Sequence, residues 1–368
     1  MIMPDRPATN NLFLLGAGFD RALYGPDIPL NGQVIPWLKN KFEYAPWTAH
    51  LARYQTTDIE RSLTYLDLEV TAPPANTSEN DRLTLRRWIE QTIARFFTDF
   101  RITPEIASKD WALTFAKAVL DKNDAIVNLN YTPLLEGLLD TAGVWTPHGG
   151  YSRFIENGVL EATSGPVRQN SLLKNIIVYK IHGSTHFHLS SVNENHEETA
   201  IGFSFNDSIF PRSGKHTNFG PGVPDLGRYV IAPSFIKTWH IQIAGMMNEV
   251  LERVNMAKNI IILGCGMRPE DNFLFLMFAN FLRAANPGGK IIVVDPNASQ
   301  VVKNIRTYSN WLWDGISQQV VKIEKELDLE SVEQLHDQLA ATKSEEGPNA
   351  RIRAHTPDPH RRTPPRGP

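Results

Sequence analysis

The first apolar run of the chain, residues 11–15, ends at a turn built around Gly16 and Gly18, and a helix-compatible segment follows. Glycines at these positions let the backbone turn tightly and let a ligand approach main-chain N–H groups, which attract phosphate at a helix N-terminus. The spacing matches the front half of a dinucleotide-binding loop, but the third glycine of that fingerprint is missing. A plain strand-to-helix turn is the alternative interpretation.

A second chemically suited position is Asn130, which follows the apolar run 125–129 and precedes a new helix. Thr132 and Pro133 suit the N-cap and the first position of that helix. A polar side chain between a parallel strand and its helix lies at the edge where open α/β sheets bind ligands. The alternative is that Asn130 only hydrogen-bonds its own turn.

A third position is His182, which ends the β-rich run 175–181 and is followed by a glycine that leaves room for a ligand. His148 is its competitor, in a less regular loop. His186 and His188 continue at a spacing of two residues, which raises the question of a metal site. The strand around these histidines has alternating polar and apolar residues and no carboxylate or cysteine side chains at positions that would complete a metal site, so we expect no bound metal.

A second glycine turn follows the run 259–263 and consists of Gly264, Cys265 and Gly266, with a proline-started helix after it. The next strand, 290–294, ends at Asp295, an acid placed to hold ribose hydroxyls. Cys265 has no histidine close in sequence, so we interpret it as a small packing residue.

These positions require parallel strands whose carboxyl ends meet at one edge, and the sequence predicts an α/β fold with a Rossmann-like parallel sheet. Between the first two strands, about residues 31–123, apolar residues recur at helical spacing, which predicts an all-helical insertion. Residues 193–227 are rich in Gly, Pro, Asp and Ser and are expected to form a long loop. A helix is expected near 329–341, and the Pro- and Arg-rich end is typical of disorder.

Composition narrows the function classes. The chain has 368 residues and a formal charge of -3, which argues against nucleic-acid binding driven mainly by electrostatic attraction. Any contact with nucleic acid would be indirect or made by the C-terminal tail. A single cysteine excludes an intrachain disulfide and suits a reducing compartment. No run approaches the length of a membrane span and no signal-peptide layout is present, so we expect a cytoplasmic protein without membrane contact.

Taken in order, five pieces of the sequence resemble the sirtuin-like NAD-consuming domain of bacterial antiphage-defence effectors, which lacks a zinc ribbon. The pieces are Gly16-Ala17-Gly18-Phe19; Asn130-Tyr131 with Leu134-Leu135-Glu136; Lys180 to Ser184; Pro233 with Lys237; and Gly264 to Asp271. The resemblance covers the chain to about residue 310. It implies a sirtuin-like domain over 1–310, with a C-terminal helical segment at 311–342 and a disordered tail at 343–368.

The resemblance also implies site residues. Asn130 would orient the water or ribose hydroxyl beside the reacting carbon, and His182 would act as the base, a role that suits a side chain titrating near neutrality. The positions that would contact the NAD⁺ substrate are Gly16, Ala17, Gly18, Phe19, Asp20, Thr132, Gly264 and Asp295.

Two positions depart from the family pattern, which usually has Ser where Asp20 stands and Asp where Thr132 stands. A carboxylate at 20 would oppose a pyrophosphate unless it caps the helix or pairs with Arg21. The acid missing at 132 would stabilise positive charge at the nicotinamide ribose. On this basis we expect Thr132→Asp to raise turnover.

The function implied by the resemblance is an NAD⁺ glycohydrolase that breaks the nicotinamide–ribose bond without a metal. It would be a toxic effector of antiphage defence, activated by homo-oligomeric assembly or by a partner protein encoded nearby. Two other hypotheses are kept: an NAD-dependent protein deacylase, and a non-catalytic sensor or assembly module that binds NAD or ADP-ribose. Thr132 and Asp20 favour the sensor.

Overall fold

The computed structural model describes residues 10–41, 44–74, 77–147, 149–156, 174, 176–191, 199–205, 216–217, 225–236, 240–284, 289–308 and 320–344. His148, Lys237 and the chain from residue 345, which includes nearly all of the predicted disordered tail, lie outside these ranges.

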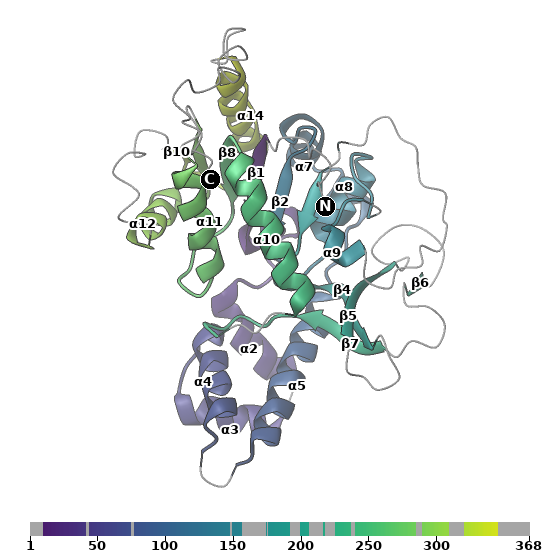
Figure 1. Ribbon diagram of the computed structural model, residues 1–368, viewed down its shortest axis with the longest axis vertical. Helices are drawn as coiled ribbons and strands as arrows, with labels where there is room; N and C mark the ends of the chain where they lie inside the picture. The colour runs from purple at the N-terminus through teal and green to yellow at the C-terminus, as the bar shows by residue number, and fades with distance from the viewer. Residues whose placement is uncertain are drawn as a thin grey trace, which may run out of the picture.

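A six-stranded parallel sheet forms the centre of the protein, in the order β10-β9-β8-β1-β2-β3, so the predicted Rossmann-like α/β fold is confirmed (Figure 1). From β1 the chain proceeds to β2 and β3 on one side, whereas β8 leads to β9 and β10 on the other. The order therefore reverses between β1 and β8, where such sheets open a ligand crevice. The strands are β1 (Asn11–Leu15), β2 (Ala125–Asn128), β3 (Ile177–Tyr179), β8 (Asn259–Leu263), β9 (Ile291–Val294) and β10 (Val320–Ile323).

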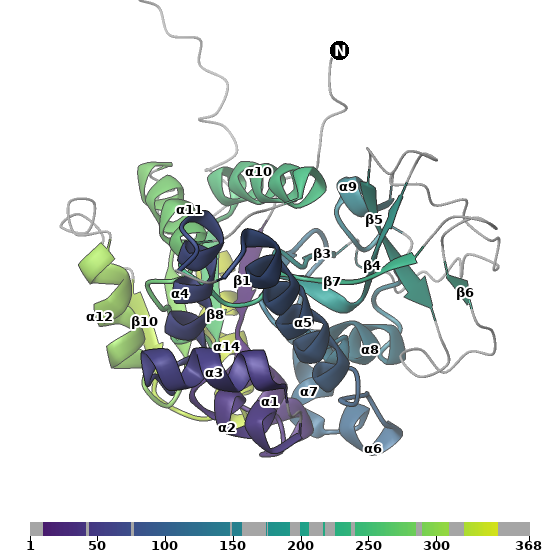
Figure 2. The same ribbon diagram turned by 90° about the horizontal axis from the view of Figure 1, so that it is seen from below.

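The central strands are apolar and covered on both faces, as parallel strands generally are. Every residue of β1, β2, β8 and β9 is buried. Helices α10 (Ile241–Met256) and α11 (Asn272–Arg283) lie on one side of the sheet, and α1 (Ala17–Tyr24), α8 (Leu134–Thr141) and α14 (Leu329–Ser344) lie on the other (Figure 2). No helix in the described ranges combines the length and apolarity needed to cross a bilayer.

Side chains at the amino ends of three strands align them. Asn11 donates from its Nδ2 to Asp124 Oδ1 at 3.1 Å, and Asn259 donates from its Nδ2 to Asn11 Oδ1 at 2.9 Å. All three residues are buried, so these bonds form in a low dielectric where breaking one is costly. They fix β2, β1 and β8 relative to one another at the edge opposite the ligand crevice.

Between β1 and β2 the described residues form helices, as predicted for the insertion. Helices α2 to α5 make up the lower part of Figure 1, next to the sheet. Inside this group the buried Glu69 accepts from Arg53 at 2.7 Å and from Tyr54 at 2.6 Å, and Arg82 lies 3.1 Å away. The insertion comprises α2 (Asn31–Lys41), α3 (Ala45–Tyr54), α4 (Ile59–Thr71), α5 (Glu79–Phe97), α6 (Pro104–Ala107), α7 (Asp110–Thr114) and the π-helical turn η1 (Phe115–Val119).

A second, antiparallel sheet in the order β6-β5-β4-β7 corrects the prediction of one long loop over residues 193–227. It contains β4 (Gly183–Ser191), β5 (Thr199–Phe205), β6 (His216–Thr217) and β7 (Asp225–Val230). The strand β5 was missed because the surrounding Gly-, Pro-, Asp- and Ser-rich sequence outweighed its short alternating pattern, and because its pairing with β4 and β6 is a tertiary contact.

The strand β10 was also not anticipated, since residues 311–342 were expected to be helical. Its four residues pair in parallel with β9 at the edge of the main sheet, and Val320, Val321 and Lys322 are not fully buried. A run of four residues is too short for its apolar pattern to distinguish a strand from part of a helix. The helix α14 follows it and agrees with the predicted helix near 329–341.

The two glycine turns pack directly on each other at the crevice. The N–H of Gly16 donates to Leu263 O at 3.1 Å, and the N–H of Gly18 donates to Gly264 O at 2.9 Å. A Cβ at Gly16 would lie 2.6 Å from Gly264 O, and one at Gly18 would lie 2.8 Å from Gly264 Cα. The glycines are thus required by backbone-to-backbone contact, which a ligand-binding interpretation alone does not explain.

We expect Gly264→Ala to lower the free energy of unfolding by about 3 kcal/mol or more, because φ is +57° there and the new Cβ would lie 2.4 Å from Phe19 N. Gly266→Ala is the matched control: its Cβ meets nothing within 4 Å, so the change should stay within about 1 kcal/mol. Urea unfolding of both variants measures the difference. Equal losses would show that the turn contact does not constrain the fold.

Candidate functional site

A cavity of about 450 Å³ opens at the carboxyl ends of the central strands, within the size range of small-molecule sites. It brings together side chains and turns from β1, β2, β8 and β9 and the residue that precedes β4. Most of the residues predicted for the site line it. These are Gly16, Ala17, Gly18, Asp20, Asn130, His182, Gly264 and Asp295.

Phe19 and Thr132, also predicted to contact ligand, do not line the cavity. Phe19 is fully buried, with its ring centroid 5.7 Å from that of Trp111 and 5.4 Å from that of Phe115. On a helix, successive side chains point in different directions, so Phe19 enters the core while Asp20 reaches the cavity. Thr132 is 1% exposed and contacts Asp20.

Asp20 is a buried carboxylate held by two donors. Asn130 donates from its Nδ2 to Asp20 Oδ1 at 2.8 Å, and Thr132 donates its hydroxyl to Asp20 Oδ2. Burial raises the pKa of the Asp20 carboxyl to about 7, and the hydrogen bond from Thr132 opposes this shift. Asp20 takes neither of the two roles anticipated for it. The N-cap of α1 is Gly16, and Arg21 donates to Gln33 instead of pairing with Asp20.

Asn130 bonds across to the first glycine turn rather than within its own turn. Its side-chain amide donates to Gly16 O at 3.0 Å as well as to Asp20. Both partners are acceptors, so Nδ2 must face them and the carbonyl Oδ1 is the atom available to a ligand hydroxyl or a water. The backbone N–H of Asn130 donates to Asn128 Oδ1 at 3.0 Å, which fixes the loop that carries it.

His182 lies against a carboxylate that the sequence analysis did not assign. Its Nε2 is 3.2 Å from Oδ1 of Asp271, which immediately precedes α11, and both side chains are partly exposed to the cavity. A carboxylate at one ring nitrogen fixes the ring orientation and stabilises the imidazolium formed when the ring accepts a proton. In the sequence, Asp271 was marked only as the last residue of the motif Gly264 to Asp271, next to a predicted helix, and no role was assigned to it.

A buried ion pair, Lys180 with Glu136, holds the loop from Asn130 to Thr132 in place. Lys180 donates from Nζ to Thr132 O at 2.7 Å and lies 3.4 Å from Glu136, and both side chains are fully buried. Burial raises the pKa of the Glu136 carboxyl, although the nearby Lys180 opposes this. The loop is therefore anchored on both sides, by Asp20 and by Lys180.

Two of the three histidines that posed the metal question, His182 and His186, lie in different surroundings. His186 is buried and bonds to Tyr151 Oη at 2.5 Å and Ser184 Oγ at 2.8 Å, whereas His182 faces the cavity. Burial lowers the pKa of His186 well below its usual value, which keeps the ring neutral. Within the described residues no group of three or more His, Cys, Asp or Glu side chains is arranged to hold a metal ion.

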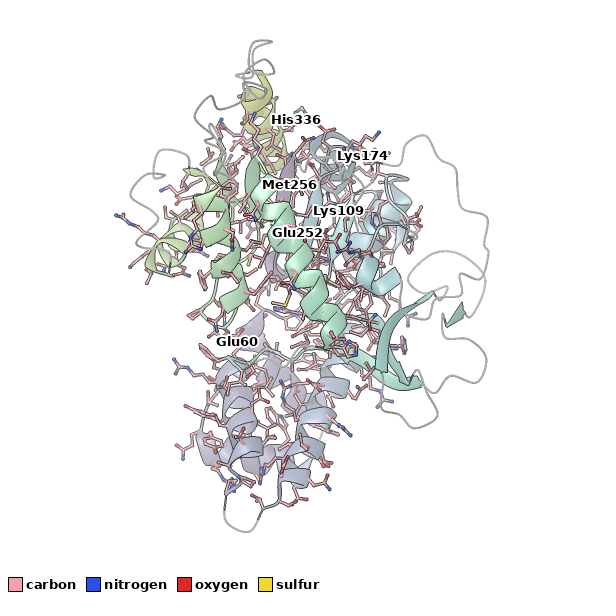
Figure 3. The ribbon with its side chains drawn as sticks, viewed as in Figure 1. Glu60, Lys109, Lys174, Glu252, Met256 and His336 are labelled. Carbon is pink, nitrogen blue, oxygen red and sulfur yellow. The ribbon has the colours of Figure 1, made fainter. Side chains whose placement is uncertain are left out.

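The remaining lining residues include two that the sequence did not single out, Glu60 and Arg268. Glu60 belongs to α4 of the helical insertion and lies where the insertion meets the sheet-bearing part of the molecule (Figure 3). Its Oε2 is 3.0 Å from Nη1 of Arg268, in the loop after β8. Cys265 also lines the cavity, and burial raises the pKa of its thiol to about 12, in agreement with a packing role.

No protein-family model matches the chain, and no curated protein matches it. Among solved structures, the fold is similar to a Sir2 homologue in complex with ADP-ribose (12% identity, 92% of this chain and 94% of that chain, TM-score 0.38). It is also similar to a Sir2 homologue–NAD complex (13% identity, 91% of this chain and 90% of that chain, TM-score 0.38). A third similar structure is titled for the mechanism and regulation of Sir2 enzymes (14% identity, 92% of this chain and 94% of that chain, TM-score 0.40). At this level of similarity no residue role is carried over from these structures, so the function is inferred from the residues that line the cavity.

The Asp20→Asn variant tests the raised pKa of Asp20. Folded protein keeps the Asp20 proton up to about pH 7, whereas the unfolded chain releases it near the ordinary aspartate pKa of 3.8, so this group makes the free energy of unfolding fall as pH rises between these values. The unfolding free energy of Asp20→Asn relative to the wild type should therefore increase from pH 5 to pH 8 by about 2–3 kcal/mol. Urea unfolding at both pH values measures it, and a pH-independent difference would mean an ordinary Asp20 pKa.

The contact between Asp20 and Thr132 revises the expectation for Thr132→Asp. The substitution would bring two carboxylates together in a buried site, so we expect a loss of several kcal/mol in unfolding free energy instead of a gain in turnover. The double variant Asp20→Ser, Thr132→Asp restores one carboxylate and one hydroxyl and should recover at least half of that loss.

A double-mutant cycle by chemical denaturation at pH 8 gives the coupling between the two positions. Additive effects of the two substitutions would refute the compensation.

Proposed function

We propose that the protein is an NAD⁺ glycohydrolase, which hydrolyses the bond between nicotinamide and ribose. One observation carries the proposal: Asn130 and His182, which follow neighbouring parallel strands, line the same cavity as the glycine turn after β1. This combination offers a hydroxyl-orienting amide and a proton acceptor beside a nucleotide-sized crevice.

In the proposed reaction the nicotinamide–ribose bond breaks and its electron pair goes to the ring nitrogen, which leaves neutral nicotinamide. The ribose carbon gains positive charge and is captured by water, whose proton must be accepted. Asn130 Oδ1 orients the water or the ribose hydroxyl, and His182, held by Asp271, takes the proton. The ionised fraction of Asp20 supplies negative charge next to Asn130.

The adenosine half of the substrate is assigned to the opposite end of the cavity, near the turn after β8. Gly264 lines the cavity after β8, and Asp295 lines it after β9. Asn297 donates its N–H to Asp295 Oδ1 at 2.7 Å, which leaves Oδ2 as an acceptor for ribose hydroxyls.

The biological role proposed here rests on the resemblance of the sequence motifs to antiphage-defence effectors. In that role a cytoplasmic enzyme depletes NAD⁺ after activation by homo-oligomeric assembly or by a partner protein. Following nicotinamide release from NAD⁺ by purified protein, with and without the product of its genomic neighbour, tests activity and activation together. Binding of NAD⁺ without cleavage under every condition would favour the sensor hypothesis.

A second candidate, NAD-dependent deacylation, is favoured by a smaller cavity of about 110 Å³ that adjoins His182 and Asp271. Its walls include Phe235, Met247 and Phe273, so it could receive an apolar group beside the proposed base. Incubation with NAD⁺ and acylated lysine peptides distinguishes the two: nicotinamide release that depends on peptide indicates deacylation, and release without peptide indicates hydrolysis.

We expect Asn130→Ala and His182→Ala each to reduce NAD⁺ cleavage at least a hundredfold, because each removes a group that acts on the reacting ribose or water. His336→Ala is the control, since His336 lies on α14 with its side chain 49% exposed and is absent from the cavity wall. Turnover is measured by nicotinamide release, and circular dichroism checks the fold. Full activity of either site variant would contradict its assigned role.

A further inference from the structure

The charges around the large cavity are unfavourable for an anionic ligand. Four carboxyl groups line it, those of Asp20, Glu60, Asp271 and Asp295. Among the described lining residues, Arg268 is the one Lys or Arg side chain. Those of the four carboxyl groups that are ionised would repel an entering pyrophosphate unless a fixed cation stabilised it.

The glycine turn after β1 offers fewer N–H donors to a phosphate group than its sequence implies. Three of the N–H groups of residues 16–19 already donate to backbone carbonyls: Gly16 to Leu263 O, Gly18 to Gly264 O, and Phe19 to Gly16 O, at 2.9–3.1 Å. Each would have to give up a buried hydrogen bond before it could donate to a phosphate. These three N–H groups therefore offer a diphosphate little, and a cationic side chain near the turn gains importance for its recognition.

Arg268 has the geometry for that task. Its side chain is 45% exposed, it lies in the loop that carries the second glycine turn, and its Nη1 contacts Glu60 Oε2 at 3.0 Å. A guanidinium carries five N–H donors in a planar fork, so one contact to Glu60 leaves capacity for bidentate binding of phosphate oxygens.

Glu60 is held in place as the partner of this cation. It is 3% exposed, and burial raises the pKa of its carboxyl to about 7, while Arg268 opposes the shift. Its helix is attached to the loop before α10 by Thr64, whose Oγ1 accepts from Phe235 N at 2.9 Å. Because α4 is fixed in this way, the Glu60 carboxylate remains beside Arg268 and next to an incoming anion.

We propose that Arg268 binds the pyrophosphate of the ligand, and that Glu60 from the helical insertion is the counter-ion of Arg268 before the ligand binds and competes with the phosphates for this guanidinium. The inference deepens the proposed function, because it rests on an NAD⁺-class ligand. If Glu60 competes in this way, the helical insertion directly affects the affinity for the ligand through this one carboxylate.

Calorimetric binding of ADP-ribose and of adenosine to the full chain tests the assignment, since only ADP-ribose carries the pyrophosphate. Arg268→Gln should raise the Kd for ADP-ribose at least tenfold and leave adenosine binding unchanged. Glu60→Gln removes the competing charge and should lower the Kd for ADP-ribose about threefold to tenfold. Arg53→Gln is the matched control: Arg53 is 43% exposed and pairs with the buried Glu69 of the same insertion, but does not line the cavity.

The outcomes separate the hypotheses. Equal ADP-ribose affinity in the wild type and Arg268→Gln would overturn the assignment of Arg268 and leave the proposed function standing. Absence of ADP-ribose and NAD⁺ binding to the wild type would overturn the ligand class itself. Weaker binding by Glu60→Gln would show that Glu60 organises Arg268 instead of competing, and an equal loss in Arg53→Gln would attribute the effect to a loosened insertion.

Discussion

The buried carboxylate of Asp20 is the interaction on which the candidate site depends. It joins the first turn of α1 to the loop after β2, because Asn130 and Thr132 both donate to it. These bonds fix which face of the Asn130 amide is presented to the cavity. Burial raises the pKa of Asp20 to about 7, so the charge beside the site varies in the neutral pH range.

The same contact links the two positions at which the chain departs from the sequence pattern that it resembles. Where that pattern has a hydroxyl at position 20 and a carboxylate at 132, this chain has Asp20 and Thr132, and the two side chains meet. The exchange keeps one carboxylate and one hydroxyl in contact while moving the negative charge to α1. Two substitutions that looked independently unfavourable are therefore interpreted as one compensated change.

Around this pair the cavity is assembled from elements that are distant in the chain. The turns at Gly16–Gly18 and Gly264 pack backbone to backbone at the point where the strand order reverses. The helical insertion contributes Glu60, which pairs with Arg268 across 208 positions of sequence. The insertion thus shapes the electrostatics of the site, although its helices lie beside the sheet.

By itself the sequence determined the features that arise from local chemistry. Continuous apolar runs specified β1, β2, β8 and β9, and their ends marked Gly16, Asn130, Gly264 and Asp295 as lining residues, because parallel strands align their carboxyl ends. Tertiary structure alone decided which side chains meet: Asp20 with Thr132, His182 with Asp271, and Glu60 with Arg268. It also decided the pairing of the internal strand β5 and of the edge strand β10. These contacts depend on the packing of elements that are remote in sequence, and burial, which sets their hydrogen bonds and pKa values, does not exist until that packing forms.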